Sequence, residues 1–211
     1  MQMKSAILSV AAIAALSAHP LAAQQVIDQN QPVAQSWFAA MFQGWSGQSF
    51  VQSGSNISGF GLFMRSINGN AATSPIDYRI YDAVPNGSNS PNVLRSGTVS
   101  TTLAANESRW IDFLFSPYDI TPGSTLFLAV TGPSAGFQVA DAFDPAGAAY
   151  AAGQAYLENV AGNQAIQGYD LTFRTYTTLA QPVTTPEPAS LTLLATGLVG
   201  IAGAVRRRRR V

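Results

Sequence analysis

Hydrophobic and polar residues alternate along much of the central chain, which is the pattern of half-buried β-strands. Ile76, Tyr78 and Ile80 share one face of such a strand, whereas Asp77 and Arg79 share the other. The same alternation recurs in three further segments, 111–115, 126–130 and 170–174. The pattern therefore predicts an all-β body.

Turn-forming residues separate nine predicted strands, and the sequences Asn68-Gly69-Asn70 and Thr121-Pro122-Gly123-Ser124 are typical of these turns. Residues 32–43 are expected to form a short helix or an irregular crossing. We expect a two-sheet antiparallel β-sandwich of jelly-roll type over residues 24–180. The predicted strands are 25–30, 47–52, 57–66, 75–83, 92–102, 109–116, 125–131, 136–142 and 169–177.

The first 23 residues have the features of a secretory signal peptide. Lys4 supplies a positive charge, residues 6–16 form an apolar run that is too short to span a membrane, and Ala23 is a small residue suited to cleavage. Signal peptidase would then cut between Ala23 and Gln24. The alternative is a buried N-terminal helix, although the segment has no amphipathic period.

Residues 189–205 contain no charge and would reach about 26 Å as a helix, near the short limit for a membrane span. Basic clusters stay on the cytoplasmic side, so this single transmembrane helix would cross the inner membrane and leave 206–211 in the cytoplasm. The alternative is a core helix followed by a basic tail. The arginines that form this topology signal are Arg206, Arg207, Arg208, Arg209 and Arg210.

Pro186, Glu187 and Pro188 stand immediately before the apolar segment, at the end of a Pro/Thr linker over residues 181–188. The two prolines keep this backbone extended, in a form that a protease can grip. Pro-Glu-Pro, a short apolar span and a terminal arginine cluster, in this order, resemble the PEP-CTERM sorting signal of Gram-negative bacteria. The resemblance implies recognition by an exosortase, cleavage near Pro-Glu-Pro, and an association with exopolysaccharide export.

Charge and composition exclude several classes of protein. Residues 24–180 hold five arginines, no lysine and ten carboxylates, which gives a formal charge of −5. The chain has no cysteine, and its one histidine, His19, lies in the leader. This excludes disulfides, thiol nucleophiles, Ser-His-Asp triads and zinc sites built from cysteine or histidine. An acidic body without lysine also argues against a nucleic-acid partner.

The body resembles secreted galactose-binding-like and carbohydrate-binding-like β-sandwich modules. The segments that carry this resemblance include Gly59-Phe60-Gly61-Leu62-Phe63, Trp110-Ile111-Asp112-Phe113 and the closing strand 170–176. A fold resemblance implies no activity by itself.

Two kinds of binding residue are candidates in such a module. Asp28 on the first strand and Asp170 on the last could converge on a structural Ca²⁺, which takes oxygen ligands; the alternative is a surface or capping role. Aromatic residues in weakly patterned segments could instead stack on sugar rings, the alternative being ordinary packing. These aromatic candidates are Trp37, Trp45, Tyr150 and Tyr156, whereas Trp110 begins a strand and is expected to pack.

Catalytic patterns are weak in this sequence. Ser134 lies in a Gly-x-Ser-x-Gly match, but it falls between two strands and no histidine is present to serve as its base. Paired carboxylates, Asp141 with Asp144 or Asp77 with Asp82, would be needed for a glycosidase. We therefore expect an exported, non-enzymatic surface or matrix protein, with a carbohydrate-binding module or a carbohydrate-active enzyme as the alternatives.

Overall fold

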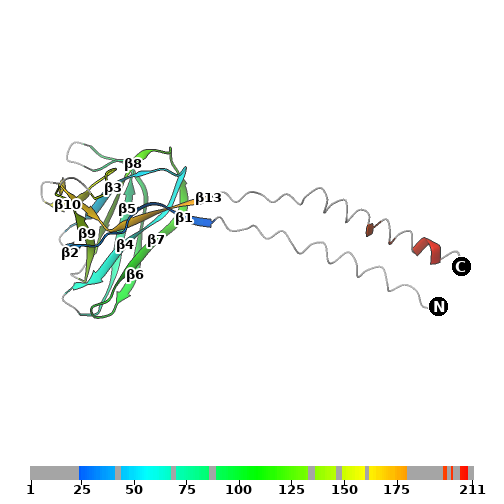
Figure 1. Ribbon diagram of the computed structural model, residues 1–211, viewed down its shortest axis with the longest axis horizontal. Helices are drawn as coiled ribbons and strands as arrows, with labels where there is room; N and C mark the ends of the chain where they lie inside the picture. Colours follow the sequence, from blue (N-terminus) through cyan, green and yellow to red (C-terminus); the bar gives the residue numbers. More distant parts are fainter. Residues whose placement is uncertain are drawn as a thin grey trace. The chain divides into compact units, whose positions relative to one another are not determined.

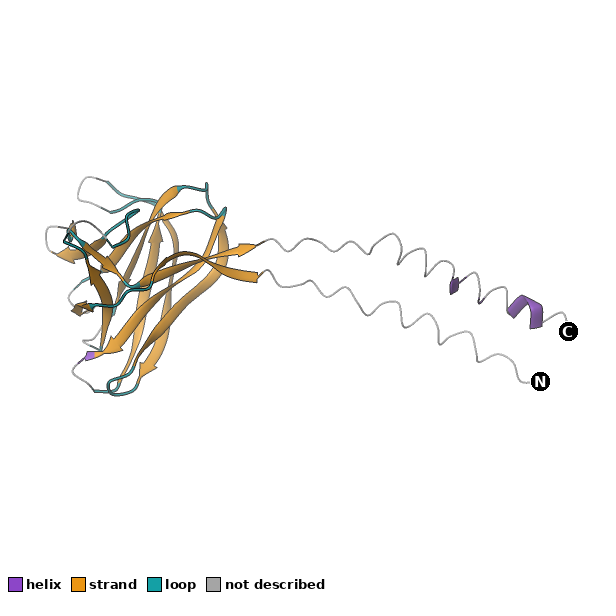
Figure 2. Ribbon diagram, in the orientation of Figure 1, coloured by secondary structure: helices purple, strands orange, loops and turns teal. Residues whose placement is uncertain are grey.

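Strands dominate the body in the computed structural model of the chain (Figure 1, Figure 2). The structure describes residues 24–40, 44–67, 70–85, 89–132, 136–145, 149–159 and 162–179, and in the tail residues 197, 198, 201 and 205–208. Residues 23–179 form one compact unit, separate from the two terminal segments. Within the described part of the body, thirteen strands form two antiparallel sheets.

Sheet A is the seven-stranded sheet, in the order β1-β13-β4-β9-β12, with β2 also pairing with β9 and β7 with β4. Strand β4 is central because it pairs with β13, β7 and β9. The strands are β1 (Gln24–Gln31), β2 (Ser36–Ala40), β4 (Asn56–Ser66), β7 (Ser108–Asp119), β9 (Phe137–Phe143), β12 (Tyr169–Leu171) and β13 (Phe173–Leu179).

Sheet B is the six-stranded sheet, in the order β11-β10-β3-β8-β5-β6. Its longest pairing joins β5 to β6, and β8 lies between β3 and β5. The strands are β3 (Ser46–Gln52), β5 (Ala72–Tyr81), β6 (Val93–Leu103), β8 (Ser124–Thr131), β10 (Ala155–Asn159) and β11 (Gly162–Ala165).

Aromatic side chains from the two sheets meet in a shared hydrophobic core. Phe50 of sheet B lies 6.0 Å from Phe173 of sheet A, measured between ring centroids. Tyr78 of sheet B lies 5.7 Å from both Phe60 and Phe113 of sheet A. Burying one such side chain stabilises the fold by about 1.5–3 kcal/mol. The two sheets therefore pack face to face, in the arrangement of a β-sandwich.

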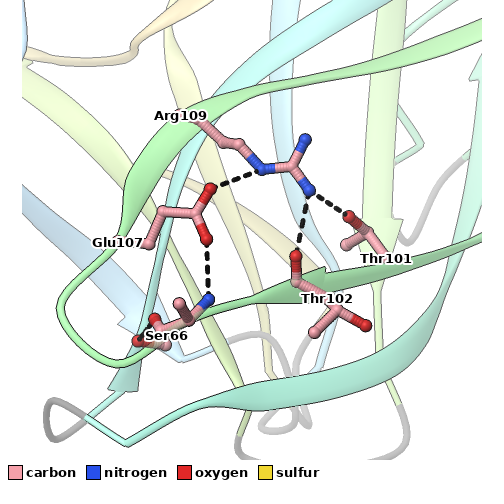
Figure 3. Close-up of polar contacts among 6 residues, drawn as sticks. Ser66, Thr101, Thr102, Glu107 and Arg109 are labelled. Atoms are coloured by element: carbon pink, nitrogen blue, oxygen red, sulfur yellow. Dashed lines mark hydrogen bonds and ion pairs between the residues drawn. The ribbon is translucent and has the colours of Figure 1, made fainter.

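Two arginines form hydrogen bonds between the edge strands β6 and β7, and Figure 3 shows the contacts of one of them, Arg109. Arg109 of β7 donates to the Thr102 carbonyl of β6 at 2.9 Å and to Thr101 Oγ1 at 3.2 Å. Its Nε lies 2.9 Å from a carboxylate oxygen of Glu107. Arg95 of β6 donates in the opposite direction, to backbone carbonyls of β7. These bonds occupy carbonyls that an edge strand would otherwise leave open to another chain.

The first and last strands of the body are direct partners. Strand β1 pairs with β13, so that Gln24 lies opposite Leu179 (Figure 1). Strand β13 also pairs with β4 on its other side. The two ends of the body therefore emerge side by side, and the tail follows a strand that has a neighbour on each side.

The prediction of an all-β body with two antiparallel sheets is confirmed, and each of the nine predicted strands overlaps an observed strand. The expectation of a helix or irregular crossing at residues 32–43 is wrong in part, because residues 36–40 form β2, which pairs with β9. The predicted strand 169–177 is divided at Thr172, and the β10–β11 hairpin was not predicted. The jelly-roll type and the galactose-binding-like resemblance stay predictions.

Candidate functional site

The outward face of sheet A carries aromatic and arginine side chains where alternation would usually place small polar groups. On β4 the even positions Phe60, Leu62 and Met64 are buried in the core, so that Phe63 and Arg65 face outward. The same phase on β7 and β13 turns their alternate residues outward. We call this set the outer strip; it consists of Trp37, Phe63, Arg65, Trp110, Asp112, Arg174 and Tyr176.

Arg174 lies at the centre of the outer strip, in a space left by a glycine. Gly61 of β4 pairs with Asp112 on one side and with Arg174 on the other. A Cβ on Gly61 would lie 2.4 Å from Asp112 Oδ1 and 2.9 Å from Arg174 Nε. The glycine therefore lets the guanidinium reach across β4 to Asp112, to which Nη2 donates at 2.9 Å.

Two aromatic rings enclose the Arg174 guanidinium. Its Cζ lies 4.4 Å from the Trp110 ring centroid and 5.5 Å from that of Tyr176. The Tyr176 hydroxyl donates to Asp112 Oδ1 at 2.6 Å. Burial, followed by the hydrogen bond and charge of Asp112, raises the pKa of Tyr176, while Arg174 opposes this. Tyr176 therefore stays a protonated donor over the physiological range.

A second cation–aromatic group continues the outer strip toward β2 and β9. Trp37 stacks on Phe63 with ring centroids 6.2 Å apart, and Phe63 meets Trp110 edge to face at 5.7 Å. Arg65 Cζ lies 4.3 Å from the Trp37 centroid. Arg65 Nε and Nη2 both donate to the neutral Gln138 Oε1, at 3.0 and 2.9 Å. The rings are half-buried, so part of each faces solvent.

The structure places the four predicted sugar-stacking residues in different regions. Trp37 belongs to the outer strip. Trp45 lies immediately before β3 of sheet B, with Arg79 Cζ 4.6 Å from its ring centroid. Tyr156, on β10 of the same sheet, contacts Phe127 edge to face at 5.3 Å. Tyr150 packs on the core, 5.1 Å from Phe173. The four residues therefore do not form a single platform.

Tyr150 forms one hydrogen bond with a predicted calcium ligand, Asp170, and another with the neighbour of the second, Asp28. Its backbone N–H donates to Asp170 Oδ2 at 2.8 Å, and its hydroxyl donates to Gln29, the residue after Asp28. Asp170 is fully buried and also accepts from Gln48 Nε2, and burial raises its pKa. Asp28 accepts from the amide and hydroxyl of Ser53. Both aspartates therefore accept hydrogen bonds from other groups of the protein, and the calcium site stays a prediction.

No group of three or more histidine, cysteine, aspartate or glutamate side chains suited to a metal occurs among the described residues. One of the two proposed carboxylate pairs, Asp77 with Asp82, is also widely spaced along its strand. Asp77 lies about 13 Å along β5 from the last residue of that strand, Tyr81, and Asp82 follows Tyr81. The two carboxyl groups of a glycosidase lie only about 5–9.5 Å apart. Asp141 is 2% exposed, accepts from Ser36 Oγ at 2.7 Å, and has its pKa raised by burial.

Several predicted residues lie outside the described part of the chain. These are Ala23, Ser134, the sorting residues Pro186, Glu187 and Pro188, and the arginines Arg209 and Arg210. Gln24 begins β1. In the tail, residues 197, 198, 201 and 205–208 are helical, and Arg206, Arg207 and Arg208 are exposed. Over the residues that can be described, no helix has the length and apolar character required to cross a membrane.

Sequence reasoning identified Trp37 but missed its partners in the outer strip. The alternation along β7 could have identified Trp110 as an outward-facing residue. Ile111 and Phe113 face the core, so Trp110, one residue before Ile111, must face the other way. Trp110 does pack, but against Phe63 and Arg174 on the outer face instead of in the core.

One comparison with known proteins bears on the tail. The family model described as the PEP-CTERM protein-sorting motif matches residues 184–210, which include Pro-Glu-Pro, the apolar segment and the arginines. No curated protein and no solved structure matches the chain significantly. By class, the molecule is an exported protein with a β-sandwich body, which passes the membrane to be secreted or held at the cell surface. More particularly, the motif supports sorting by an exosortase.

Proposed function

We propose that this protein is a non-enzymatic component of the cell surface or of the extracellular polysaccharide matrix, delivered there by its sorting tail. The observation that carries the proposal is the PEP-CTERM match at residues 184–210, which begins five residues after β13 ends. The tail would serve delivery and transient anchoring, and the β-sandwich would be the part that is displayed.

The arrangement of the strands favours display. Because Gln24 pairs with Leu179, the first and last residues of the sandwich lie side by side in one strand pair of sheet A. In this proposal signal peptidase cuts before Gln24, the apolar segment 189–205 holds the precursor in the inner membrane, and an exosortase then cuts near Pro186-Glu187-Pro188.

A carbohydrate-binding role is the second candidate, and the outer strip favours it. Half-buried aromatic rings beside a few oriented polar groups are typical of sites that bind small organic ligands. A carbohydrate-active enzyme is less well supported, because Asp141 and Asp170 are buried and their hydrogen bonds join parts of the protein. Moreover, Leu171 and not Asp170 lies opposite Asp141 across the β9–β12 pair, so the two carboxylates point to opposite faces.

Two variants of the full chain, produced in an exporting host that encodes an exosortase, test the delivery step. Replacing Pro186, Glu187 and Pro188 with alanine should leave an anchored but unprocessed protein. Replacing the five arginines 206–210 with glutamine should weaken retention in the membrane, because the apolar span is short.

Mass spectrometry of the surface-released protein is the measurement. The wild-type protein should begin at or near Gln24 and lack both the apolar segment and the arginines. Released protein that still ends in Val211 would show that the tail is a plain anchor, and the proposal would fail.

A further inference from the structure

Arg65 carries a positive charge that no carboxylate balances in the described part of the structure. The two ion pairs found there join Arg109 to Glu107 and Arg174 to Asp112. Arg65 instead donates Nε and Nη2 to the neutral amide of Gln138. Since a guanidinium has five N–H groups, Nη1 and one N–H of Nη2 are left for another acceptor. The outer strip thus has a formal charge of +1 on a body whose charge is −5.

An aromatic surface adjoins this unbalanced charge. Trp37, which lies under Arg65, stacks on Phe63 with an interplanar angle of 24°, and Phe63 leads to Trp110. Within the described residues, neither indole N–H has a hydrogen-bond partner. Aromatic rings offer flat apolar area with a polar handle at the edge. The C–H faces of a pyranose ring fit such a surface, and its hydroxyls can accept from the indole N–H groups.

From this juxtaposition we infer that the outer strip binds an acidic saccharide, a chain that contains uronate sugars. Sugar rings contact the solvent-facing parts of the Trp37, Phe63 and Trp110 rings, and one carboxylate accepts from Arg65. On β4, Gly61, Phe63 and Arg65 are each two residues apart and lie on the same face. This part of the outer strip is therefore about 13 Å long, which is enough for more than one sugar unit. The inference rests on the proposed function, since it names the matrix component that the displayed domain would contact.

An arginine–tryptophan pair on sheet B provides a matched control. Arg79 lies over Trp45 on sheet B, as Arg65 lies over Trp37 on sheet A. Asp77 is two residues before Arg79 and faces the same way, so a carboxylate lies on the same face of β5 as the Arg79 guanidinium. Arg79→Gln therefore removes a similar cation–aromatic contact without touching the inferred site.

The test is a fluorescence titration of the full chain in detergent with oligogalacturonate. The chain has three tryptophans, two of which are Trp37 and Trp110 of the outer strip. We expect saturable quenching, and at least tenfold weaker binding of the methyl-esterified oligomer, because charge-assisted bonds to arginine are among the strong ones. Arg65→Gln should weaken binding by about tenfold, whereas Arg79→Gln should leave it unchanged.

A third variant separates a binding role from a structural one. Gln138→Glu places a carboxylate at the atom that Arg65 already contacts, so it should raise the unfolding midpoint while weakening oligogalacturonate binding by about tenfold. A purely structural role for Arg65 would give the stabilisation without a change in binding. Trp45→Phe should keep the quenching, and Trp37→Phe should reduce it.

Several outcomes would overturn the inference. These are the absence of quenching, equal binding of the methyl-esterified oligomer, equal effects of Arg65→Gln and Arg79→Gln, or binding to anionic lipid vesicles in place of the oligomer. None of them alters the mass of the released protein, so failure of this inference is distinguishable from failure of the proposed sorting.

Discussion

The outward faces of the two sheets use similar residues in different ways. On sheet B the central aromatic, Phe127, is fully buried, and its ring lies where a side chain on Gly47 would be. On sheet A the corresponding space above Gly61 is filled by the ends of two charged side chains, Arg174 and Asp112. The outer face of sheet B is thus a small second core, whereas that of sheet A is a half-exposed surface.

The difference shows that residue type alone does not separate a packing aromatic from an available one. Tyr81 and Tyr156 both contact Phe127 and help to cover it. Trp37 and Trp110 contact arginines whose polar ends lie at the surface. The two faces differ in what fills the space beside their glycines: the buried Phe127 ring lies beside Gly47, whereas the Arg174–Asp112 ion pair lies beside Gly61.

The largest expected contrast comes from truncating one aromatic on each face. Phe127→Ala should reduce the free energy of unfolding by about 4 kcal/mol, because a fully buried ring leaves a cavity. Phe63→Ala should cost about half as much, roughly 2 kcal/mol, because Phe63 is half-buried. Chemical denaturation measures both values. Equal losses would contradict the distinction between a second core and an open surface.

Adding one methyl group to each glycine gives the next contrast. In Gly47→Ala the new Cβ would lie 2.2 Å from the Phe127 ring and 2.7 Å from the Leu128 carbonyl, so we expect a loss of about 3 kcal/mol. In Gly61→Ala the nearest atoms are ends of flexible side chains, so the loss should be about 1 kcal/mol. Thermal unfolding of the two variants measures the difference, and the reverse order would refute it.

Removing one arginine from each face should have smaller effects. Arg174→Gln loses a two-oxygen contact with Asp112 and two aromatic contacts, and it should cost about 1 kcal/mol after allowance for solvent screening. Arg79→Gln, on an exposed residue, should cost only a few tenths of a kcal/mol, roughly 0.3. Urea denaturation at low and high salt is the measurement, and only the first loss should shrink with salt.

The smallest expected effect is the alkaline pH dependence that Tyr176 of sheet A contributes. Because the pKa of Tyr176 is raised in the folded protein, the unfolded chain loses this proton first, and stability should fall as the pH rises above about 10. Tyr176→Phe should flatten this alkaline decline. The unfolding midpoint between pH 9 and 11 measures it, with Tyr81→Phe on sheet B as the control. An unchanged slope in Tyr176→Phe would argue against the raised pKa.

Local patterns predicted most of the fold. Ile76 and Ile80 alternate with polar residues and are buried as expected, because one face of their strand meets the other sheet. Alternation failed on β8, where Phe127 and Ala129 are buried along with Leu128. On the outer face the Phe127 ring is covered in part by Tyr81 of β5 and Tyr156 of β10. The strand 155–159 was missed because its sequence has no alternation of its own.

Long-range polar contacts set the limit of the sequence reasoning. Thr172 interrupts the last strand because its amide donates to Ala140 and its hydroxyl to Val33, residues far away in the chain. In the same way, the partners of Trp37 in the outer strip depend on the register of β4 against β7 and β13, which composition does not reveal. The sequence therefore predicted one member of the outer strip, Trp37. The register of β4 against β7 and β13, in which Gly61 pairs with Asp112 and Arg174, revealed the residues of those strands.

The pairing of β1 with β13 also sets an order of events during export. A chain that crosses a membrane from its N-terminus presents Gln24 first, yet the partner of that residue is Leu179. The first strand must therefore wait, unpaired, until almost all of the body has been translocated. The hydrogen bonds between β1 and β13 then form as the linker that follows Leu179 leaves the membrane, so completion of the fold and exit of the linker coincide.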